Sequence, residues 1–256
     1  MKILIYPNYE QMSVAAARFV ADCILDKPRC VLGLATGETP IGLYAELARL
    51  HHEEGLDFSG VTTFNLDEYC DLPKEDSRSF HSFMWRHLFS HVNVDPRKVH
   101  TLKGTAPDLE EECRRYESLI KDTGGIDLQV LGIGVNGHIG FNEPGSPPDG
   151  RTRVVTLTAQ TVEINRAKEK VESLPGRAVS MGIGTIMDAK QILLLAAGRS
   201  KADIVHRATR GPVTPSVPAS ILQNHANALF MLDLEAASLL ETGFLNTPCA
   251  AGECTV

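Results

Sequence analysis

The sequence of 256 residues predicts an α/β fold: a three-layer α/β/α arrangement with a mostly parallel, doubly wound sheet. Short apolar runs alternate with longer amphipathic segments, which is typical of parallel strands joined by crossover helices. The apolar runs are nearly continuous, as expected where helices cover both faces of a sheet. The composition, 43% hydrophobic and 22% charged residues, excludes disordered, collagen-like and disulfide-scaffold classes.

Seven apolar runs are expected to form strands. The first is broken by Pro7-Asn8, and the sixth belongs to the longest apolar run of the chain. Each run is short and bounded by polar or turn-forming residues, as buried strands are. In chain order the expected strands are Lys2–Tyr6, Cys30–Ala35, Val61–Leu66, Ile126–Ile133, Ala178–Ile183, Ile192–Ala196 and Ala228–Leu232.

Five amphipathic segments between these runs are expected to form helices. Thr39 and Pro40 mark the start of the second, as N-cap and first helical residue, because those residue types favour those positions. Phe80 and Met84 lie on the apolar face of the third. In chain order the expected helices are Tyr9–Leu25, Ile41–Glu53, Ser79–Phe89, Leu109–Lys121 and Lys201–Arg207.

The chain is expected to form one catalytic domain, residues 1–241, followed by a short C-terminal tail, residues 242–256. At roughly 150 residues per domain the length allows one domain or two, but no repeat, low-complexity tract or long linker divides it. The least regular stretch, Pro144–Gly150, precedes a charged segment, Val162–Glu172. We expect a mobile flap there, around residues 158–176.

The formal net charge of −7 argues against a protein that holds nucleic acid over a broad surface. Any phosphate is expected to be one group in one pocket. The apolar stretch Met1–Tyr6 is too short for a signal peptide, and the longest apolar run, Ile192–Ala197, is far below the ~20 residues that span a bilayer. We therefore expect no membrane association and a cytoplasmic location.

The cysteines and histidines predict no metal site. His87 and His91 are four residues apart on an expected helix, but Leu88 stands where the H-E-x-x-H motif has Glu, so both are interpreted as surface histidines. The cysteines form no C-x-x-C pair and no zinc spacing, and they are expected to be free thiols in a reducing compartment. They are Cys23, Cys30, Cys70, Cys113, Cys249 and Cys254.

Ligands of an open parallel sheet bind beyond the carboxyl ends of its strands, and three candidate sites follow expected strands. The first is a turn into a helix formed by Thr36, Gly37, Glu38 and Thr39. The free N–H groups of a helix start suit one phosphate, although the Walker spacing is absent. Glu38 opposes an anion site unless its side chain points away. The alternative is an ordinary strand-to-helix turn.

The second site is the pair of carboxylates Asp67 and Glu68, which follows an expected buried strand. A carboxylate partly shielded from water gains basicity, as proton abstraction next to a carbonyl requires. The alternative is a helix N-terminus or turn in which the helix dipole favours acidic residues.

The third site is a glycine-rich loop whose Gly132, Gly134 and Gly137 match the G-x-G-x-x-G motif of dinucleotide sites. Gly140 and Pro144 follow so closely that no long helix can open there to receive a pyrophosphate. The dinucleotide interpretation, and with it a dehydrogenase, is therefore set aside.

What remains in this loop is His138, with Asn136 and Glu143 close enough in sequence to orient it as an acid/base catalyst or proton shuttle. A buried structural histidine is the alternative. Two basic residues complete the set of candidates: Arg166 in the expected flap and Lys201 at a helix start after a strand. For each of them a solvated charge is the alternative.

Six motifs in this order and spacing resemble those of the glucosamine-6-phosphate deaminase family. The resemblance covers roughly Lys2 to Glu235 and stops at the tail. The combination of the second and third motifs is highly specific. The motifs are L-A-T-G-E-T-P, F-N-L-D-E-Y, G-V-N-G-H-I-G-F-N-E-P, the R-T-R…N-R segment from Arg151 to Arg166, G-I-G-T at Gly182–Thr185 and G-R-S-K at Gly198–Lys201.

The resemblance implies conversion of glucosamine 6-phosphate and water to fructose 6-phosphate and ammonia, without metal or organic cofactor. By position, Asp67 is implied to be the base that moves a proton from C2 to C1 of the open-chain sugar, and His138 to assist ring opening. Asn136 and Glu143 are implied to orient or tune His138. The phosphate is implied to bind Thr36, Gly37, Glu38, Thr39, Arg166 and Lys201.

Three departures qualify this inference. Glu38 stands where the family often has Gly or Ser, and the tail does not align. Relatives that N-acetylglucosamine 6-phosphate activates have Ser and Lys where this chain has Pro147 and Val155, although Arg153 is kept. We therefore expect weak or absent allosteric activation, and the sequence leaves self-association open.

Two other functions are alternatives to the deaminase. A 6-phosphogluconolactonase-type lactone hydrolase shares the fold, but its loop continues with Ala-Ser-Leu-Phe-Pro where this chain has Gly140–Pro144. A sugar-phosphate sensor joined to a DNA-binding module is disfavoured, because no helix-turn-helix segment precedes the domain and the charge is acidic.

Overall fold

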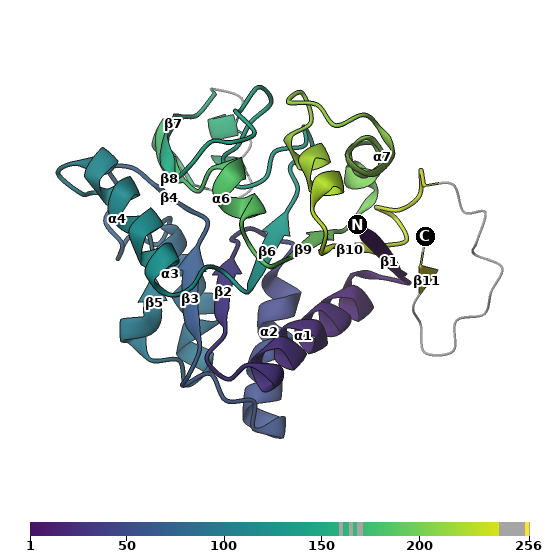
Figure 1. Ribbon diagram of the computed structural model, residues 1–256, viewed down its shortest axis with the longest axis horizontal. Coiled ribbons are helices and arrows are strands. Elements are labelled where there is room, and N and C mark those ends of the chain that lie inside the picture. Colours follow the sequence, from purple (N-terminus) through teal and green to yellow (C-terminus); the bar gives the residue numbers. More distant parts are fainter. Residues whose placement is uncertain (159–160, 164–165, 168–170, 241–253, 256) are drawn as a thin grey trace.

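The computed structural model describes residues 1–158, 161–163, 166–167, 171–240 and 254–255 (Figure 1). Its centre is an eight-stranded sheet in the order β11-β1-β10-β9-β6-β2-β3-β5, in which the pairings are parallel except that β11 runs antiparallel to β1. The predicted α/β class is therefore confirmed. The strands are β1 (Lys2–Tyr6), β2 (Val31–Leu34), β3 (Thr62–Asn65), β5 (Val99–His100), β6 (Leu128–Gly132), β9 (Gln191–Ala196), β10 (Ala228–Asp233) and β11 (Cys254–Thr255).

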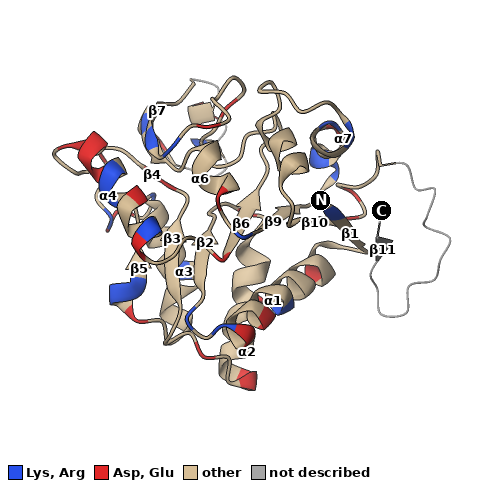
Figure 2. Ribbon diagram, in the orientation of Figure 1, with Lys and Arg blue, Asp and Glu red and all other residues tan. Residues whose placement is uncertain are grey.

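Helices cover both faces of this sheet, so neighbouring residues on one strand enter different cores. Leu32 of β2 packs with Met12 and Tyr44 from the helices of one face, whereas Val31 packs with Tyr116 from the other. The inner strands β2, β3, β6 and β9 carry no charged residue, and charges lie on the helices and loops outside them (Figure 2). The helices are α1 (Tyr9–Asp26), α2 (Ile41–Glu54), α3 (Phe80–His87), α4 (Leu109–Asp122), α6 (Ile183–Met187) and α7 (Ala202–Arg210), with 3-10 turns at Phe89–His91, Pro96–Lys98, Arg199–Lys201 and Pro218–Asn224.

A second, antiparallel sheet in the order β4-β8-β7 adjoins the first. It consists of β4 (Asp67–Tyr69), β8 (Arg177–Ser180) and β7 (Arg153–Thr156). The expected strand Ala178–Ile183 is present as β8 but is shorter and pairs antiparallel rather than parallel, and Ile183 already begins α6. Leu66 joins the two sheets, because its N–H donates to Leu34 of β2 (3.0 Å) and its carbonyl accepts the N–H of Met181 (2.8 Å).

The predicted cap at the start of α2 is also wrong. The helix begins at Ile41, and Pro40 occupies the cap position without a capping side chain. Thr39 does not cap because Tyr9 of α1 satisfies this end of the helix instead: its hydroxyl accepts the Gly42 N–H (2.7 Å) and donates to the Thr39 carbonyl (3.1 Å). The turn before α2 is therefore held by a tertiary contact.

The expected flap and tail are described only in part. Residues 159–160, 164–165 and 168–170 of the flap and 242–253 and 256 of the tail lie outside the described residues. The described flap residues Val162, Val171 and Leu174 pack with Tyr69 and Phe141, and mobility of the flap stays a prediction. Within the described ranges no helix has the length and apolarity needed to cross a bilayer. Among the described residues, the cysteines with free thiols are Cys23, Cys30, Cys70 and Cys113.

Asp127, just before β6, connects three segments at the amino ends of the inner strands. Its carboxylate accepts hydrogen bonds from Lys27 (2.8 and 2.7 Å), from the Val31 N–H (2.8 Å) and from Lys190 (2.7 Å). Burial alone would raise the pKa of Asp127, but the hydrogen bonds from Lys190, Lys27 and Val31 outweigh it and hold the pKa below its usual range.

We expect Asp127→Asn to lower the free energy of unfolding by about 2 kcal/mol at pH 7, because charge-assisted bonds are lost and two lysines lose their partner. A carboxyl whose folded pKa is depressed stabilises the fold above its unfolded pKa and loses that contribution as pH falls through the folded value. The difference between wild type and variant should therefore shrink below about pH 4. Urea unfolding from pH 3 to 8 measures it, with the exposed Asp122→Asn as control. An equal difference at pH 3 and pH 7 would contradict this account.

Candidate active site

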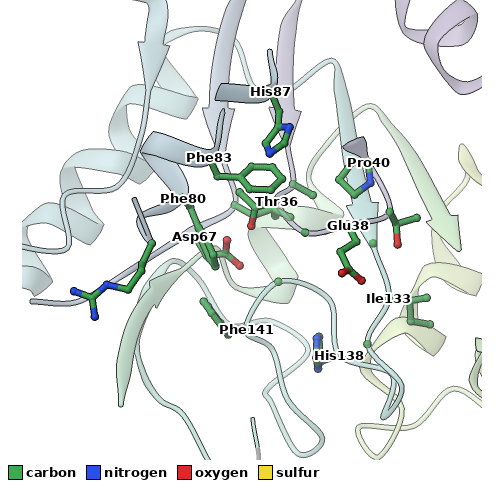
Figure 3. A pocket seen from close by; sticks show the side chains of 18 of the residues that line it. Thr36, Glu38, Pro40, Asp67, Phe80, Phe83, His87, Ile133, His138 and Phe141 are labelled. Carbon is green, nitrogen blue, oxygen red and sulfur yellow. The ribbon is translucent and has the colours of Figure 1, made fainter. Parts of the chain in front are cut away.

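A cavity of about 790 Å³ lies beyond the carboxyl ends of the inner strands (Figure 3). The segments that follow β2, β3, β6 and β9 each contribute to its wall, as the strand-end rule predicts. One face of α3 completes it. The segments are 35–40, 66–67, 132–141 in part, 197–201 in part, and 77–87 in part.

The turn after β2 forms one wall of the cavity. Gly37 has φ +103°, a left-handed conformation in which a side chain would be strained, so glycine lets the chain turn here. Glu38 is exposed, and Figure 3 shows its carboxylate extending from the turn into the cavity rather than away from it. Lys201 also lines the cavity, and its ammonium group donates to the Ile133 carbonyl (2.7 Å). Lys201 therefore shares the cavity wall with a turn that itself carries a carboxylate.

Asp67 is the buried carboxylate of the cavity, with 7% of its surface exposed. It opens β4, opposite Ser180 of β8, so the alternative of a helix N-terminus or turn is wrong. Burial, with the neighbouring charge of Glu68 acting in the same direction, raises the pKa of Asp67 to about 8. Gly140 brings the loop after β6 close to it, since a Cβ there would lie 3.5 Å from Asp67 Oδ2.

Glu68 points to the other side of β4, as successive strand residues do. Its carboxylate accepts the N–H groups of Tyr69, Phe80 and His81, each at 2.9 Å. Burial nevertheless raises the pKa of Glu68, against those three hydrogen bonds. Of the two adjacent carboxylates, Glu68 thus holds the first turn of α3 and Asp67 faces the cavity.

His138 sits on a scaffold made by glycine, asparagine and glutamate. A side chain at Gly134 would collide with the imidazole, so glycine gives the ring its place. The Asn136 side chain accepts the main-chain N–H of His138 (3.2 Å) and donates to Glu143 Oε2 (2.6 Å), and Glu143 Oε1 lies 3.5 Å from His138 Nδ1. No helix occurs between 133 and 152, so the G-x-G-x-x-G spacing here seats a histidine.

The predicted site residues divide into three groups. Those that line one cavity are Thr36, Gly37, Glu38, Thr39, Asp67, His138 and Lys201. Asn136 and Glu143 lie behind His138 and contact it. Arg166 does not line the cavity; its guanidinium is paired with Glu163 (2.6 Å) and is 40% exposed. Nine of the ten predicted residues therefore lie in or directly behind the wall of one cavity, and Arg166 does not.

The sequence did not predict the wall of the cavity that α3 forms. Phe80, Phe83, Arg86 and His87 of α3 line the cavity, and the interpretation of His87 as a surface histidine is wrong. Burial lowers the pKa of His87, with Arg86 and His91 acting in the same direction. The position of α3 in the sequence could have indicated this wall, because a helix that follows the third expected strand can cover the carboxyl end of that strand. Among the described residues, no three His, Cys, Asp or Glu side chains are placed to hold a metal ion.

Comparison with known proteins places the chain in a family. Residues 8–231 match the family model "Glucosamine-6-phosphate isomerases/6-phosphogluconolactonase". The chain is 48% identical to a glucosamine-6-phosphate deaminase of Thermoanaerobacter pseudethanolicus over 241 residues (94% of this chain, 95% of the relative) and 50% identical to that of Alkaliphilus oremlandii (94% and 100%).

Solved structures agree with these relatives. A structure described as a monomeric glucosamine-6-phosphate deaminase, a "missing link of the NagB superfamily", superposes with a TM-score of 0.90 at 47% identity, covering 93% of this chain and all of that one. A 6-phosphogluconolactonase from Trypanosoma cruzi has a TM-score of 0.75 at 20% identity (94% and 97%), which shows the shared fold alone. The resemblance seen in the motifs is confirmed: the chain belongs to the glucosamine-6-phosphate isomerase/6-phosphogluconolactonase family.

Proposed function

We propose that the chain is a glucosamine-6-phosphate deaminase, which converts glucosamine 6-phosphate and water to fructose 6-phosphate and ammonia. The observation that carries the proposal is a buried carboxylate, Asp67, and an oriented imidazole, His138, in the wall of one cavity. Near 48–50% identity to deaminases over 94% of the chain supports the same reaction. The free thiols of the described cysteines suit a reducing compartment, and we propose the cytoplasm as its location.

The phosphate of the substrate is proposed to bind between the turn of Thr36–Thr39 and Lys201. Backbone N–H groups at such a turn and a lysine ammonium suit one phosphate group. Arg166 is proposed as a further contact, for which it has to leave its ion pair with Glu163. Glu38 acts against phosphate binding by repulsion, since its carboxylate extends into the same cavity.

His138 is proposed to open the sugar ring by donating a proton to the ring oxygen as the bond from C1 to that oxygen breaks. The C1 hydroxyl gives its proton to water in the same step and becomes the aldehyde. The imidazole has to be held in one orientation for this step. Glu143 Oε1, 3.5 Å from Nδ1, provides that constraint, while Asn136 holds the loop by accepting the main-chain N–H of His138. The carboxylate of Glu143 stabilises the protonated imidazole.

Asp67 is proposed to take the proton from C2 of the open-chain sugar and return it to C1. The new double bond lies first between C1 and C2, and the amino group at C2 then becomes an imine. Water adds to that imine and ammonia leaves, so the ketose phosphate remains. A buried carboxylate with a raised pKa is a stronger base than one in water, and each positioned proton transfer contributes about 10²–10⁴-fold.

The direct test is incubation of the purified protein with glucosamine 6-phosphate and no added metal. We expect equal amounts of ammonia and fructose 6-phosphate, measured by coupled enzymatic assays. Because lactonases share the fold, 6-phosphogluconolactone is the second substrate to test. Hydrolysis of the lactone without release of ammonia would refute the deaminase and favour the alternative.

We expect Asp67→Asn to lower kcat roughly 10³-fold and leave KM little changed, because the amide keeps the shape but cannot accept the C2 proton. Asp71→Asn, an exposed aspartate four residues on, is the matched control and should behave as wild type. In the wild type kcat/KM should rise with pH up to about 8, since only ionised Asp67 acts as base. A loss confined to KM would contradict the assignment.

The same variant has a predicted effect on stability. The raised pKa of Asp67 means that the folded protein holds its proton to about pH 8, whereas the unfolded chain releases it near pH 4. The protonated carboxyl of Asp67 makes its full contribution to the free energy of unfolding below about pH 4, and this contribution is lost as pH rises through about 8. The Tm of Asp67→Asn relative to that of wild type should therefore rise from about pH 4 to about pH 8 and level off above it.

We expect His138→Gln to lower kcat/KM for glucosamine 6-phosphate about 10²-fold while sparing a substrate that cannot form a ring, because the histidine acts on the ring oxygen. The 4,5-dideoxy analogue lacks both hydroxyls that close five- and six-membered rings. His52→Gln, on the exposed side of α2, is the control. Equal losses on the two substrates would place His138 in another step.

A further inference from the structure

Thr161 contacts the catalytic loop from the segment that follows β7. Only 7% of its surface is exposed, and its hydroxyl donates to Glu143 Oε1 at 2.9 Å. The same oxygen lies 3.5 Å from His138 Nδ1. Thr161 and His138 therefore approach one carboxylate oxygen, although they are 23 positions apart in the chain.

The hydrogen bonds around Thr161 determine which partner its hydroxyl donates to and which it accepts from. The Thr161 N–H donates to Thr158 Oγ1 (3.1 Å), and the two threonine hydroxyls are 2.9 Å apart. Because the Thr161 proton goes to the carboxylate, which only accepts, Thr158 has to donate in the contact between the hydroxyls. The result is a directed chain from Thr158 to Thr161 to Glu143, and such chains polarise each member.

The other oxygen of Glu143 is held as well. Asn136 donates to Oε2 at 2.6 Å, and the Asn136 amide oxygen accepts the His138 N–H. With one donor on each oxygen, the carboxylate plane is fixed relative to the imidazole. Without Thr161, a single contact to Asn136 would leave Glu143 free to rotate about its terminal bond, and Oε1 would lose its place beside Nδ1.

We propose that Thr161 is a positioning residue for ring opening: its hydroxyl holds Glu143 Oε1 beside His138 and so keeps the imidazole in its working orientation. The proposal rests on the proposed function and extends it to a residue that does not line the cavity. It also gives the segment after β7 a part in catalysis that is separate from phosphate binding by Arg166.

The test compares Thr161→Val, which keeps the shape of the side chain and removes the hydroxyl, with Thr161→Ser, which keeps the hydroxyl. Thr156→Val on β7 is the matched control, because that threonine is exposed. We expect Thr161→Val to lower kcat/KM for glucosamine 6-phosphate about tenfold, as loss of one bond to a charged group does, and to spare the 4,5-dideoxy analogue. Thr161→Ser and Thr156→Val should match wild type on both substrates.

Equal losses of Thr161→Val on the two substrates, or a loss in Thr161→Ser as large as in Thr161→Val, would overturn the proposal in favour of a purely structural role. An unchanged Thr161→Val would overturn it too. Ammonia release by the wild type tests the proposed function separately from these comparisons.

A readout without substrate keeps the inference testable if the wild type releases no ammonia. The ¹H and ¹⁵N shifts of the His138 ring, recorded at one pH, should move in Thr161→Val and not in Thr161→Ser. Unchanged shifts in both would refute the contact. The other charged groups of the cavity wall are the same in all three proteins, namely Glu38, Asp67, Arg78, Arg86, His87 and Lys201.

Discussion

The burial of Asp67 is the constraint on which the rest of the site depends. A carboxylate withdrawn from water costs several kcal/mol unless it is paired or protonated, and here the raised pKa of Asp67, to about 8, records that cost. The fold tolerates this cost because Asp67 is the first residue of β4, and the packed cores of the two sheets hold its backbone in place. The cost of desolvation therefore falls on the carboxylate of Asp67 and makes it more basic.

Two sheets meeting at one residue produce this burial. Leu66 hydrogen bonds to β2 with its N–H and to Met181, beyond β8, with its carbonyl, so the chain passes from the parallel to the antiparallel sheet without a loop. Asp67 then faces the cavity, and Glu68 faces α3, where three backbone N–H groups hold its charge. The alternation of a strand therefore gives two adjacent carboxylates different environments and different roles.

Most of the fold and the strand-end part of the cavity wall could be predicted from the sequence, because the strands are apolar runs and the wall residues directly follow them. Continuous runs located the parallel strands, and their carboxyl ends located Thr36, Asp67, His138 and Lys201 in one cavity. β4 and its antiparallel pairing with β8 escaped prediction, because Asp67 pairs with Ser180, more than a hundred residues away, and β4 is too short to show a pattern. The α3 wall and Thr161 depend on how helix and loop pack, which no local spacing encodes.

The loop of His138 shows why a spacing motif needs its structural context. In a dinucleotide site the glycines let a pyrophosphate approach a helix N-terminus. Here no helix follows, and Gly134 makes room for an imidazole while Gly137, at φ +90°, turns the chain back toward it. Glycine provides space and left-handed backbone in both cases. In this loop the space holds a histidine, whose main-chain N–H bonds to Asn136 and whose Nδ1 lies 3.5 Å from Glu143 Oε1.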